Sequence, residues 1–338
     1  QFQCGGYARP GSVGSGLKRG AGYSYYLKTE GNRKMIKEYQ IYNETRLPAK
    51  RIVSLAPSFT QTLFFLGLED RIVGCTENCL QNHDLKNVLT VGRFASPDLA
   101  GIRELNPDLI LGLDRVHSEA LTVLKQSKAG IFVQRIQTVF GIIGAIEAIN
   151  KLAGNSREGA AKVRKLRKRL QRVCSRLQGV KPVRVYRMLS TEPLVTPSAA
   201  CYQYDAIHLA GGEQMQLDFA DPYTPVSPAD VFAFDPEFIV SCGQGENQPA
   251  KPRCQGCKKE KPICMRTPAD IINADGWNGT TAARNGQVYT IGCESLCYPG
   301  PGLIDGIEMM AGLFHPDLQA GIAAEEDAQE EQTVQIKI

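Results

Sequence analysis

The sequence predicts an α/β protein of two similar lobes joined by one long helix. Three observations support this prediction. Short apolar segments alternate with helix-length segments, motifs of the first half recur in the second, and a basic amphipathic segment (157–178) separates the halves. Alternation of strands and helices at these lengths is typical of a parallel sheet covered on both faces.

The first lobe is predicted to span 49–156. Its apolar segments are short, and turn signals separate them from the segments with helical periodicity. The turn at Asn106-Pro107-Asp108 divides a helix from the strand that follows it. In chain order, the predicted elements are strand "RIVSLAPS" (51–58), helix "FTQTLFFLGL" (59–68), strand "DRIVGCTE" (70–77), helix and strand "PDLAGIRELNPDLILGL" (97–113), and helix and strand "SEALTVLKQSKAGIFVQR" (118–135).

The second lobe is predicted to span 180–317, and part of it echoes the first. Ser96-Pro97-Asp98 precedes Asn106-Pro107-Asp108 and an apolar run, and Ser227-Pro228-Ala229 precedes Asp235-Pro236-Glu237 and another apolar run. We interpret this as a degenerate internal repeat, hence two Rossmann-like lobes. The predicted elements are strand "PVRVYRML" (182–189), helix and turn "YDAIHLAGGEQM" (204–215), and helix, turn and strand "SPADVFAFDPEFIVSCG" (227–243).

The segment between the lobes, 157–179, is predicted to be a single spine helix. Its apolar residues recur at spacings of three and four, which forms one stripe along a helix roughly 30 Å long. Residues 157–178 carry nine Lys or Arg against one Glu. No aromatic residues interleave with these charges, so the pattern indicates a solvated helix face, and no nucleic-acid partner is expected. The stripe consists of Val163, Leu166, Leu170, Val173 and Leu177.

The two ends of the chain differ from the lobes. Residues 1–48 are interpreted as a Gly-rich arm followed by a hairpin over 23–43. Residues 318–338 are interpreted as an acidic tail ending in "QTVQIKI", whose alternation is typical of a strand. Such a strand could add to its own sheet or to that of another subunit, so self-association through the termini, even into a filament, is one hypothesis. The sequence contains no run of eighteen apolar residues, so it predicts no membrane-spanning helix.

Six motifs in order over about 50–317 resemble a known family, the substrate-binding proteins of ABC importers for cobalamin, haem and ferric siderophores in which one long helix joins two lobes. The pattern is most similar to the cobalamin-binding members. The resemblance implies a ligand cleft between the lobes, no enzymatic activity, and a periplasmic or extracellular location with the signal peptide removed. The motifs are "RIVSLAPSFTQTLFFLGLEDRIVGCTE", "VGRFASPDLAGIRELNPDLILG", "HLAGGEQ", "SPADVFAFDPEFIVSCG", "ARNGQVYTIG" and "PGPGLIDGIEMMAGLFHPD".

The resemblance also implies which loops meet the ligand, namely those at the carboxyl ends of the strands. Aromatic side chains there would form a platform for a planar metal chelate, with a corrinoid or haem first and a ferric siderophore second. The expected ligand-binding residues are Phe59, Arg93, Phe94 and Arg115 of the first lobe and Tyr202, Tyr223 and Tyr298 of the second.

The match departs from the family where a permease would dock. Family members usually present one Glu on each lobe to Arg residues of the permease. Ala100 and Ala229 occupy the nearest positions here, with Asp98 and Asp230 close by. An ABC permease is therefore a possible partner whose docking glutamates are not found.

The chain has eleven cysteines. In an exported protein disulfides are the first expectation; the alternatives are thiolates that hold zinc, copper(I) or an iron–sulfur cluster, and free thiols. The insertion 242–264 contains "RCQGCKKEKPIC"; haem attachment is excluded because Lys258 stands where a His is needed. We expect Cys242, Cys254, Cys257 and Cys264 to form disulfides or a structural metal site.

Two further pairs share a C-x3-C spacing, Cys75 with Cys79 and Cys293 with Cys297. Both fall on predicted cleft loops, one in each lobe. Either they form disulfides, or they face each other and hold a metal ion or iron–sulfur centre between the lobes. A binding protein with a thiolate-held metal cofactor is therefore an alternative function. The histidines show no catalytic or metal-ligand spacing, and His117 beside Arg115 is the one that could contact a ligand.

Overall fold

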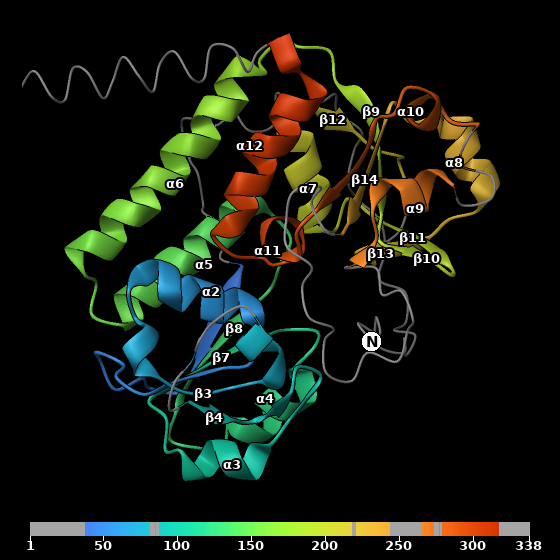
Figure 1. Ribbon diagram of the computed structural model, residues 1–338. Helices are drawn as coiled ribbons and strands as arrows, with labels where there is room; N and C mark the ends of the chain where they lie inside the picture. Colours follow the sequence, from blue (N-terminus) through green and yellow to red (C-terminus); the bar gives the residue numbers. More distant parts are fainter. Residues whose placement is uncertain are drawn as a thin grey trace, which may run out of the picture.

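The computed structural model describes residues 38–81, 85, 88–217, 221–243, 265–273, 277 and 279–317. Figure 1 shows two α/β lobes beside one long helix, as the sequence predicts. Most of the predicted arm and hairpin, the cysteines Cys254, Cys257 and Cys264, and the tail strand 332–338 lie outside the described residues.

The first lobe contains a six-stranded sheet in the order β1-β8-β7-β2-β3-β4. Its strands run parallel except β1, which pairs antiparallel with β8 at one edge. Every residue of β7 and β8 is buried, as expected for central strands covered by helices on both faces. The strands are β1 (Tyr39–Tyr42), β2 (Ile52–Ser54), β3 (Ile72–Cys75), β4 (Leu89–Thr90), β7 (Leu109–Leu113) and β8 (Gly130–Gln134).

Helices cover this sheet and carry local signals for where they begin and end. Helix α2 (Pro57–Leu66) begins two residues before the predicted start, because proline is well suited to the first turn. It ends at Gly67, whose φ of 72° is the left-handed conformation that glycine adopts without strain. The lobe's remaining elements are α3 (Leu99–Glu104), α4 (Ser118–Leu124), α5 (Val139–Leu152), the short helices η1 (Glu69–Arg71) and η2 (Glu77–Gln81), and the hairpin β5 (Gly92–Arg93) with β6 (Ser96–Pro97).

The second lobe has a smaller parallel sheet in the order β12-β9-β14-β15, flanked by a three-stranded antiparallel sheet β10-β11-β13. The strands are β9 (Val183–Met188), β10 (Ser190–Thr191), β11 (Leu194–Pro197), β12 (Gly212–Glu213), β13 (Tyr223–Pro225), β14 (Phe238–Cys242) and β15 (Val288–Ile291). The helices are α7 (Tyr202–Leu209), α8 (Pro228–Phe234), α9 (Pro268–Ile272), α10 (Thr281–Arg284), α11 (Cys293–Leu296) and α12 (Gly302–Phe314).

The internal repeat predicted from the sequence has the same hydrogen bonds in both lobes. In the first lobe, Arg51 N donates to the carboxylate of Asp108 at 3.0 Å, and Asp108 N donates to the Arg51 carbonyl at 2.8 Å. In the second lobe, Arg184 N donates to the Glu237 carboxylate at 2.9 Å, and Glu237 N donates to the Arg184 carbonyl at 2.8 Å. The acidic residue after each Asx-Pro turn therefore fastens the turn to the neighbouring strand.

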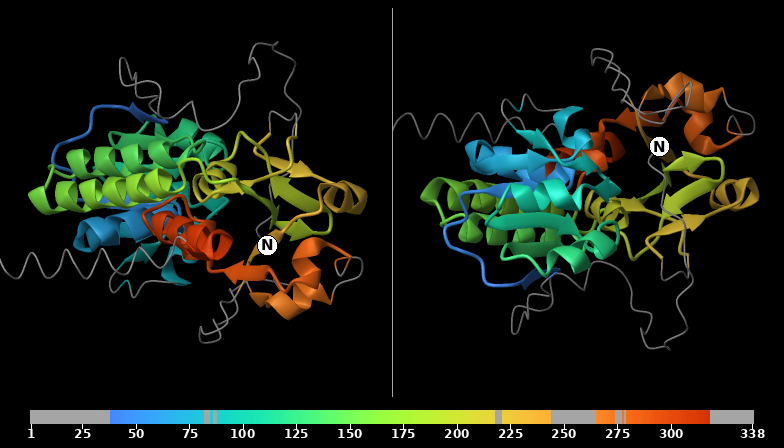
Figure 2. Two further views of the ribbon diagram at one scale, coloured as in Figure 1. Left: turned by 90° about the horizontal axis from the view of Figure 1, so that it is seen from above. Right: turned by 90° about the horizontal axis from the view of Figure 1, so that it is seen from below.

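The predicted spine helix is α6 (Arg157–Arg176). All five residues of its apolar stripe are buried. It packs against α2 and α5 of the first lobe and α12 of the second, an arrangement that Figures 1 and 2 show from three directions. The helix therefore contributes to the cores of both lobes. No helix in the described ranges is long and apolar enough to cross a membrane.

Part of the basic charge on α6 pairs with acidic residues of both lobes. Arg167 forms an ion pair with Glu147 of α5. Arg169 pairs with Asp305 of α12 at 2.6 Å and also with Glu308. The side-chain hydrogen bonds to Glu308, followed by those to Asp305, raise the pKa of Arg169. The basic stretch is thus partly a docking surface for the two lobes.

We expect Arg169→Gln to lower the free energy of unfolding by roughly 1–3 kcal/mol, because it removes charge-assisted hydrogen bonds from a mostly buried side chain. Urea unfolding followed by circular dichroism measures this loss. Lys168→Gln, at an exposed neighbouring position, is the matched control and should change stability by less than about 0.5 kcal/mol. Equal effects of the two substitutions would show that the α6–α12 pairs contribute nothing to stability.

Candidate functional site

The loops at the carboxyl ends of the parallel strands come together between the lobes. Arg115, after β7, forms an ion pair at 3.3 Å with Asp221, which precedes β13. Closer to the spine, Gln61 of α2 donates to the carbonyl of Glu294 in α11 at 3.3 Å. In open α/β sheets ligands bind outside these carboxyl ends. We therefore take the loops around the Arg115–Asp221 pair as the candidate ligand site.

On the first-lobe side, Arg93 and Phe94 lie on the hairpin β5–β6, and Phe94 contacts the loop that follows β7. Arg93 is exposed, and its Nε lies 3.7 Å from the Glu77 carboxylate. Phe94 is half-buried, and its backbone N–H donates to Asn78 Oδ1 at 3.2 Å. The hairpin β5–β6 therefore carries a cationic side chain beside Glu77 and an aromatic side chain packed against His117, two residues from Arg115.

The buried His117 contacts the backbone of both Leu113 and Phe94. Its Nδ1 accepts the Leu113 N–H at 2.9 Å, and its Nε2 lies 2.7 Å from the Phe94 carbonyl. Both contacts are satisfied by the neutral ring that carries its proton on Nε2. Burial lowers the pKa of His117 to about 4, although the hydrogen bond to Phe94 opposes the shift. His117 is 1% exposed, so it positions Phe94 and does not offer its ring to a ligand as the sequence suggested.

Phe59 lies elsewhere than expected. It is 1% exposed and packs edge-on against Phe132 of β8, with ring centroids 6.2 Å apart. Its position on α2 faces the sheet, because the apolar residues of this helix cover the strands. The structure therefore places Phe59 in the core of the first lobe.

On the second-lobe side, Tyr223 and Tyr298 are half-buried, whereas Tyr202 is buried. The Tyr202 hydroxyl donates to the carbonyl of Cys297 at 2.5 Å, and burial raises the pKa of Tyr202. Tyr202 therefore ties α7 to the end of α11. Burial also raises the pKa of Cys201 to about 11, while a hydrogen bond from the neighbouring Tyr223 acts in the opposite direction.

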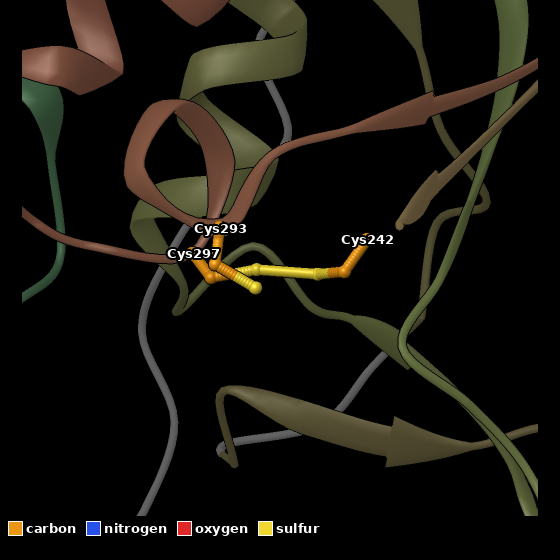
Figure 3. Close-up of side chains that lie close together, drawn as sticks. All are labelled: Cys242, Cys293 and Cys297. Carbon is orange, nitrogen blue, oxygen red and sulfur yellow. A yellow bond between two sulfur atoms is a disulfide. The ribbon is translucent and has the colours of Figure 1, made fainter. Parts of the chain in front are cut away.

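The structure groups the cysteines differently from the predicted pairs. Cys242, at the end of β14, forms a disulfide with Cys297, and Cys293 lies with them, all three sulfurs being within 4.8 Å of one another (Figure 3). Cys75 and Cys79 are buried next to each other in the first lobe, where their mutual contact and burial raise the pKa of Cys75. In the described part of the chain, the two C-x3-C pairs do not form a single group of four ligands.

The acidic residues nearest the expected permease-docking positions are helix caps. The Asp98 carboxylate accepts the N–H groups of Ala100 and Gly101 at 3.1 and 3.2 Å. Asp230 closes a capping box with Ser227, and hydrogen bonds from Ser227 lower its pKa. Each carboxylate therefore caps the N-terminus of its helix.

A hollow of about 680 Å³ lies away from these loops, beside the edge strand β4 of the first lobe. It shares none of the expected ligand-binding residues. We assign it no part in the candidate site. Its apolar lining includes Phe64, Leu85, Val88, Leu89 and Leu105.

The chain is similar to known proteins along most of its length. The vitamin B12-binding protein of Vibrio cholerae is 24% identical over 268 residues, covering 78% of this chain and 88% of that protein. A crystal structure of the periplasmic vitamin B12-binding protein of Vibrio cholerae covers 80% of this chain and 98% of its own, with a TM-score of 0.66 and 24% identity. A periplasmic haem-binding protein in complex with two haems covers 80% and 99%, with a TM-score of 0.65 and 19% identity.

The family comparison agrees with the fold. The model of the periplasmic binding protein family matches residues 52–294, which reach from β2 of the first lobe to α11 of the second. The match therefore includes both lobes and the spine helix, together with the loops on either side of the candidate site. This chain belongs to the periplasmic binding protein family.

Proposed function

We propose that this protein is an extracytoplasmic solute-binding protein that holds a corrinoid between its two lobes and delivers it to an ABC permease. The observation that carries the proposal is the family match across both lobes, together with relatives named for binding vitamin B12. Haem is the second candidate ligand and a ferric siderophore the third. No catalytic step is part of the proposal.

The chemistry of the candidate site suits such a ligand. Phe94 on one lobe and Tyr223 and Tyr298 on the other offer aromatic faces against which a planar macrocycle can stack. Arg93 and Arg115 offer guanidinium groups for the amide, carboxylate or phosphate groups at a macrocycle's edge. Phe59 and Tyr202 are left out of the proposed contact set because both are buried.

Delivery would require docking of the loaded protein on its permease. Because Ala100 and Ala229 are exposed and the adjacent carboxylates are engaged as helix caps, other surface groups of the lobes would make this contact. The proposed lobe boundaries are 49–156 and 180–317, with β1 (Tyr39–Tyr42) adding an edge strand to the first lobe from the preceding segment.

The proposal is tested by titrating the purified protein with cyanocobalamin and, separately, with haemin in a calorimeter. We expect saturable binding of cyanocobalamin with one ligand per chain. Phe94→Ala and Tyr223→Ala should each weaken the affinity roughly tenfold or more, as removal of a central aromatic contact usually does. Phe232→Ala is the control, because this exposed aromatic lies on α8, at the far side of the second lobe.

The possible outcomes distinguish a wrong ligand from wrong contact residues. Binding of haemin but not cyanocobalamin would replace the corrinoid by the second candidate. If neither molecule binds, the ligand class is wrong. If cyanocobalamin binds and the Phe94 and Tyr223 variants behave like the Phe232 control, the function stands and the proposed contact residues do not.

A further inference from the structure

Arg187, in β9, is a cation at the centre of the second lobe. It is 0% exposed. Its Nη1 donates to the carbonyls of Met188 and Val240 at 2.8 and 3.3 Å, and its Nη2 donates to the sulfurs of Cys242 and Cys297 at 2.8 and 3.5 Å. Burial lowers the pKa of Arg187 to about 10, which leaves the side chain charged at neutral pH.

No carboxylate in the described ranges pairs with this buried charge. None of the ion pairs formed among the described residues includes Arg187. Burying an ion costs several kcal/mol unless an opposite charge accompanies it. The two sulfurs that accept hydrogen bonds from Nη2 are neutral as a disulfide and anionic as thiolates. In the part of the chain that the structure describes, ionised cysteines around the guanidinium are therefore the groups that can balance its charge.

Three cysteine sulfurs converge beside Arg187. Cys242 approaches from the end of β14, while Cys293 and Cys297 stand one helical turn apart at α11, and Figure 3 shows the three side chains meeting. Cys293 is outside the disulfide, yet its sulfur is within 4.8 Å of both bonded sulfurs. Thiolates that share one tetrahedral zinc ion, at about 2.3 Å each, lie about 3.8 Å apart. Adjustments of about 1 Å would bring the three sulfurs to that spacing.

We propose that Cys242, Cys293 and Cys297, when reduced, bind one thiophilic metal ion, with Arg187 as the counter-charge. Thiolate ligands select zinc or copper(I) over calcium or magnesium. A divalent ion with three thiolates carries one net negative charge, which the single positive charge of the guanidinium neutralises. The charge balance therefore favours zinc. Thiolates on different irons of a cluster stand farther apart than thiolates on one ion, so the convergence favours a single ion.

The metal-bound state and the disulfide are alternatives. A dithiol reductant supplies two electrons and two protons to the Cys242–Cys297 bond, which becomes two thiols, while the reductant itself becomes a disulfide. The ion then displaces the protons of the three thiols into solvent. The site would thus hold metal under reducing conditions and close as a disulfide under oxidising ones. This inference does not depend on the proposed ligand.

The test uses the full chain, reduced with a dithiol and desalted without oxygen. Zinc is titrated against a chromophoric chelator, and cobalt(II) is used separately because its thiolate complexes absorb in the near ultraviolet. Two triple variants are compared, the site variant Cys242→Ser/Cys293→Ser/Cys297→Ser and the control Cys254→Ser/Cys257→Ser/Cys264→Ser. We expect the site variant to lose one equivalent of zinc and the cobalt–thiolate band, and the control variant to keep both.

Cys293→Ser alone provides a variant that can still form the Cys242–Cys297 disulfide before reduction. It should weaken zinc binding at least tenfold once reduced. Retention of zinc by the site variant, loss of zinc by the control variant, or absence of zinc binding by the unaltered chain would each overturn the proposal. Circular dichroism of every variant establishes that a loss of zinc reflects missing ligands and not unfolding.

Discussion

Replacing Leu170 by alanine should lower the free energy of unfolding by roughly 2–5 kcal/mol, the usual cost of leaving a cavity in a packed core. Leu170 is 0% exposed and lies in the second half of α6, in the same hydrophobic cluster as residues of both lobes. The lost contacts therefore weaken the attachment of each lobe to the spine. Urea unfolding measures the change.

Two probes show whether the lobes respond together. Trp277 is the protein's single tryptophan and is buried in the second lobe, so its fluorescence follows that lobe, whereas far-ultraviolet circular dichroism follows both. Both midpoints should shift equally. Gln171→Ala, on the exposed face of α6, is the control and should change stability by about 0.5 kcal/mol or less. A fluorescence midpoint that stays in place while the dichroism midpoint moves would mean that the lobes unfold independently.

The spine and the repeat could be predicted because their signals are local. The apolar stripe of α6 has helical spacing, and the helix occupies 157–176 against a predicted 157–179. The two Asx-Pro turns could be predicted because Asn and Asp tolerate the positive φ that such turns need. Asn106 and Asp235 adopt φ values of 44° and 43°. In both cases a few neighbouring residues determine the structure, so the pattern is visible in the chain.

Other parts of the structure depend on contacts between residues that are distant in sequence. Helix α5 is not among the predicted elements, because apolar residues cover most of its surface where it packs against α6 and α7. Only a narrow face with Gly144, Glu147 and Lys151 is left partly exposed. Whether an aromatic residue near the carboxyl end of a strand faces a ligand or the core is decided by the elements that pack against it. Tyr202 was expected at the site and is buried against the end of α11 in its own lobe. The pairing of Cys242 with Cys297 joins residues 55 positions apart, a relation that cysteine spacing cannot reveal.

Acidification from pH 6.5 to pH 4 is expected to remove about 3 kcal/mol of stability through His117 alone. Burial lowers its pKa from 6.5 to about 4, and each pKa unit corresponds to about 1.4 kcal/mol. The sign follows from the depressed pKa in the folded state. Between these pH values the unfolded chain takes up a proton that the folded chain excludes, so stability is fully present above pH 6.5 and falls as the pH approaches 4. Protonation would also replace the Nδ1 acceptor of the Leu113 N–H by a second donor.

His117→Gln isolates this contribution, because the amide cannot titrate and all other ionisable groups remain, including His208, whose pKa burial also lowers. Urea unfolding at intervals between pH 7 and pH 4.5 should show the unaltered protein losing stability more steeply than the variant. Since His117 Nε2 contacts the Phe94 carbonyl, ligand affinity at the candidate site should weaken over the same pH range in the unaltered protein and less in the variant. Parallel pH profiles would mean that His117 titrates normally in the folded protein and does not hold Phe94 in place.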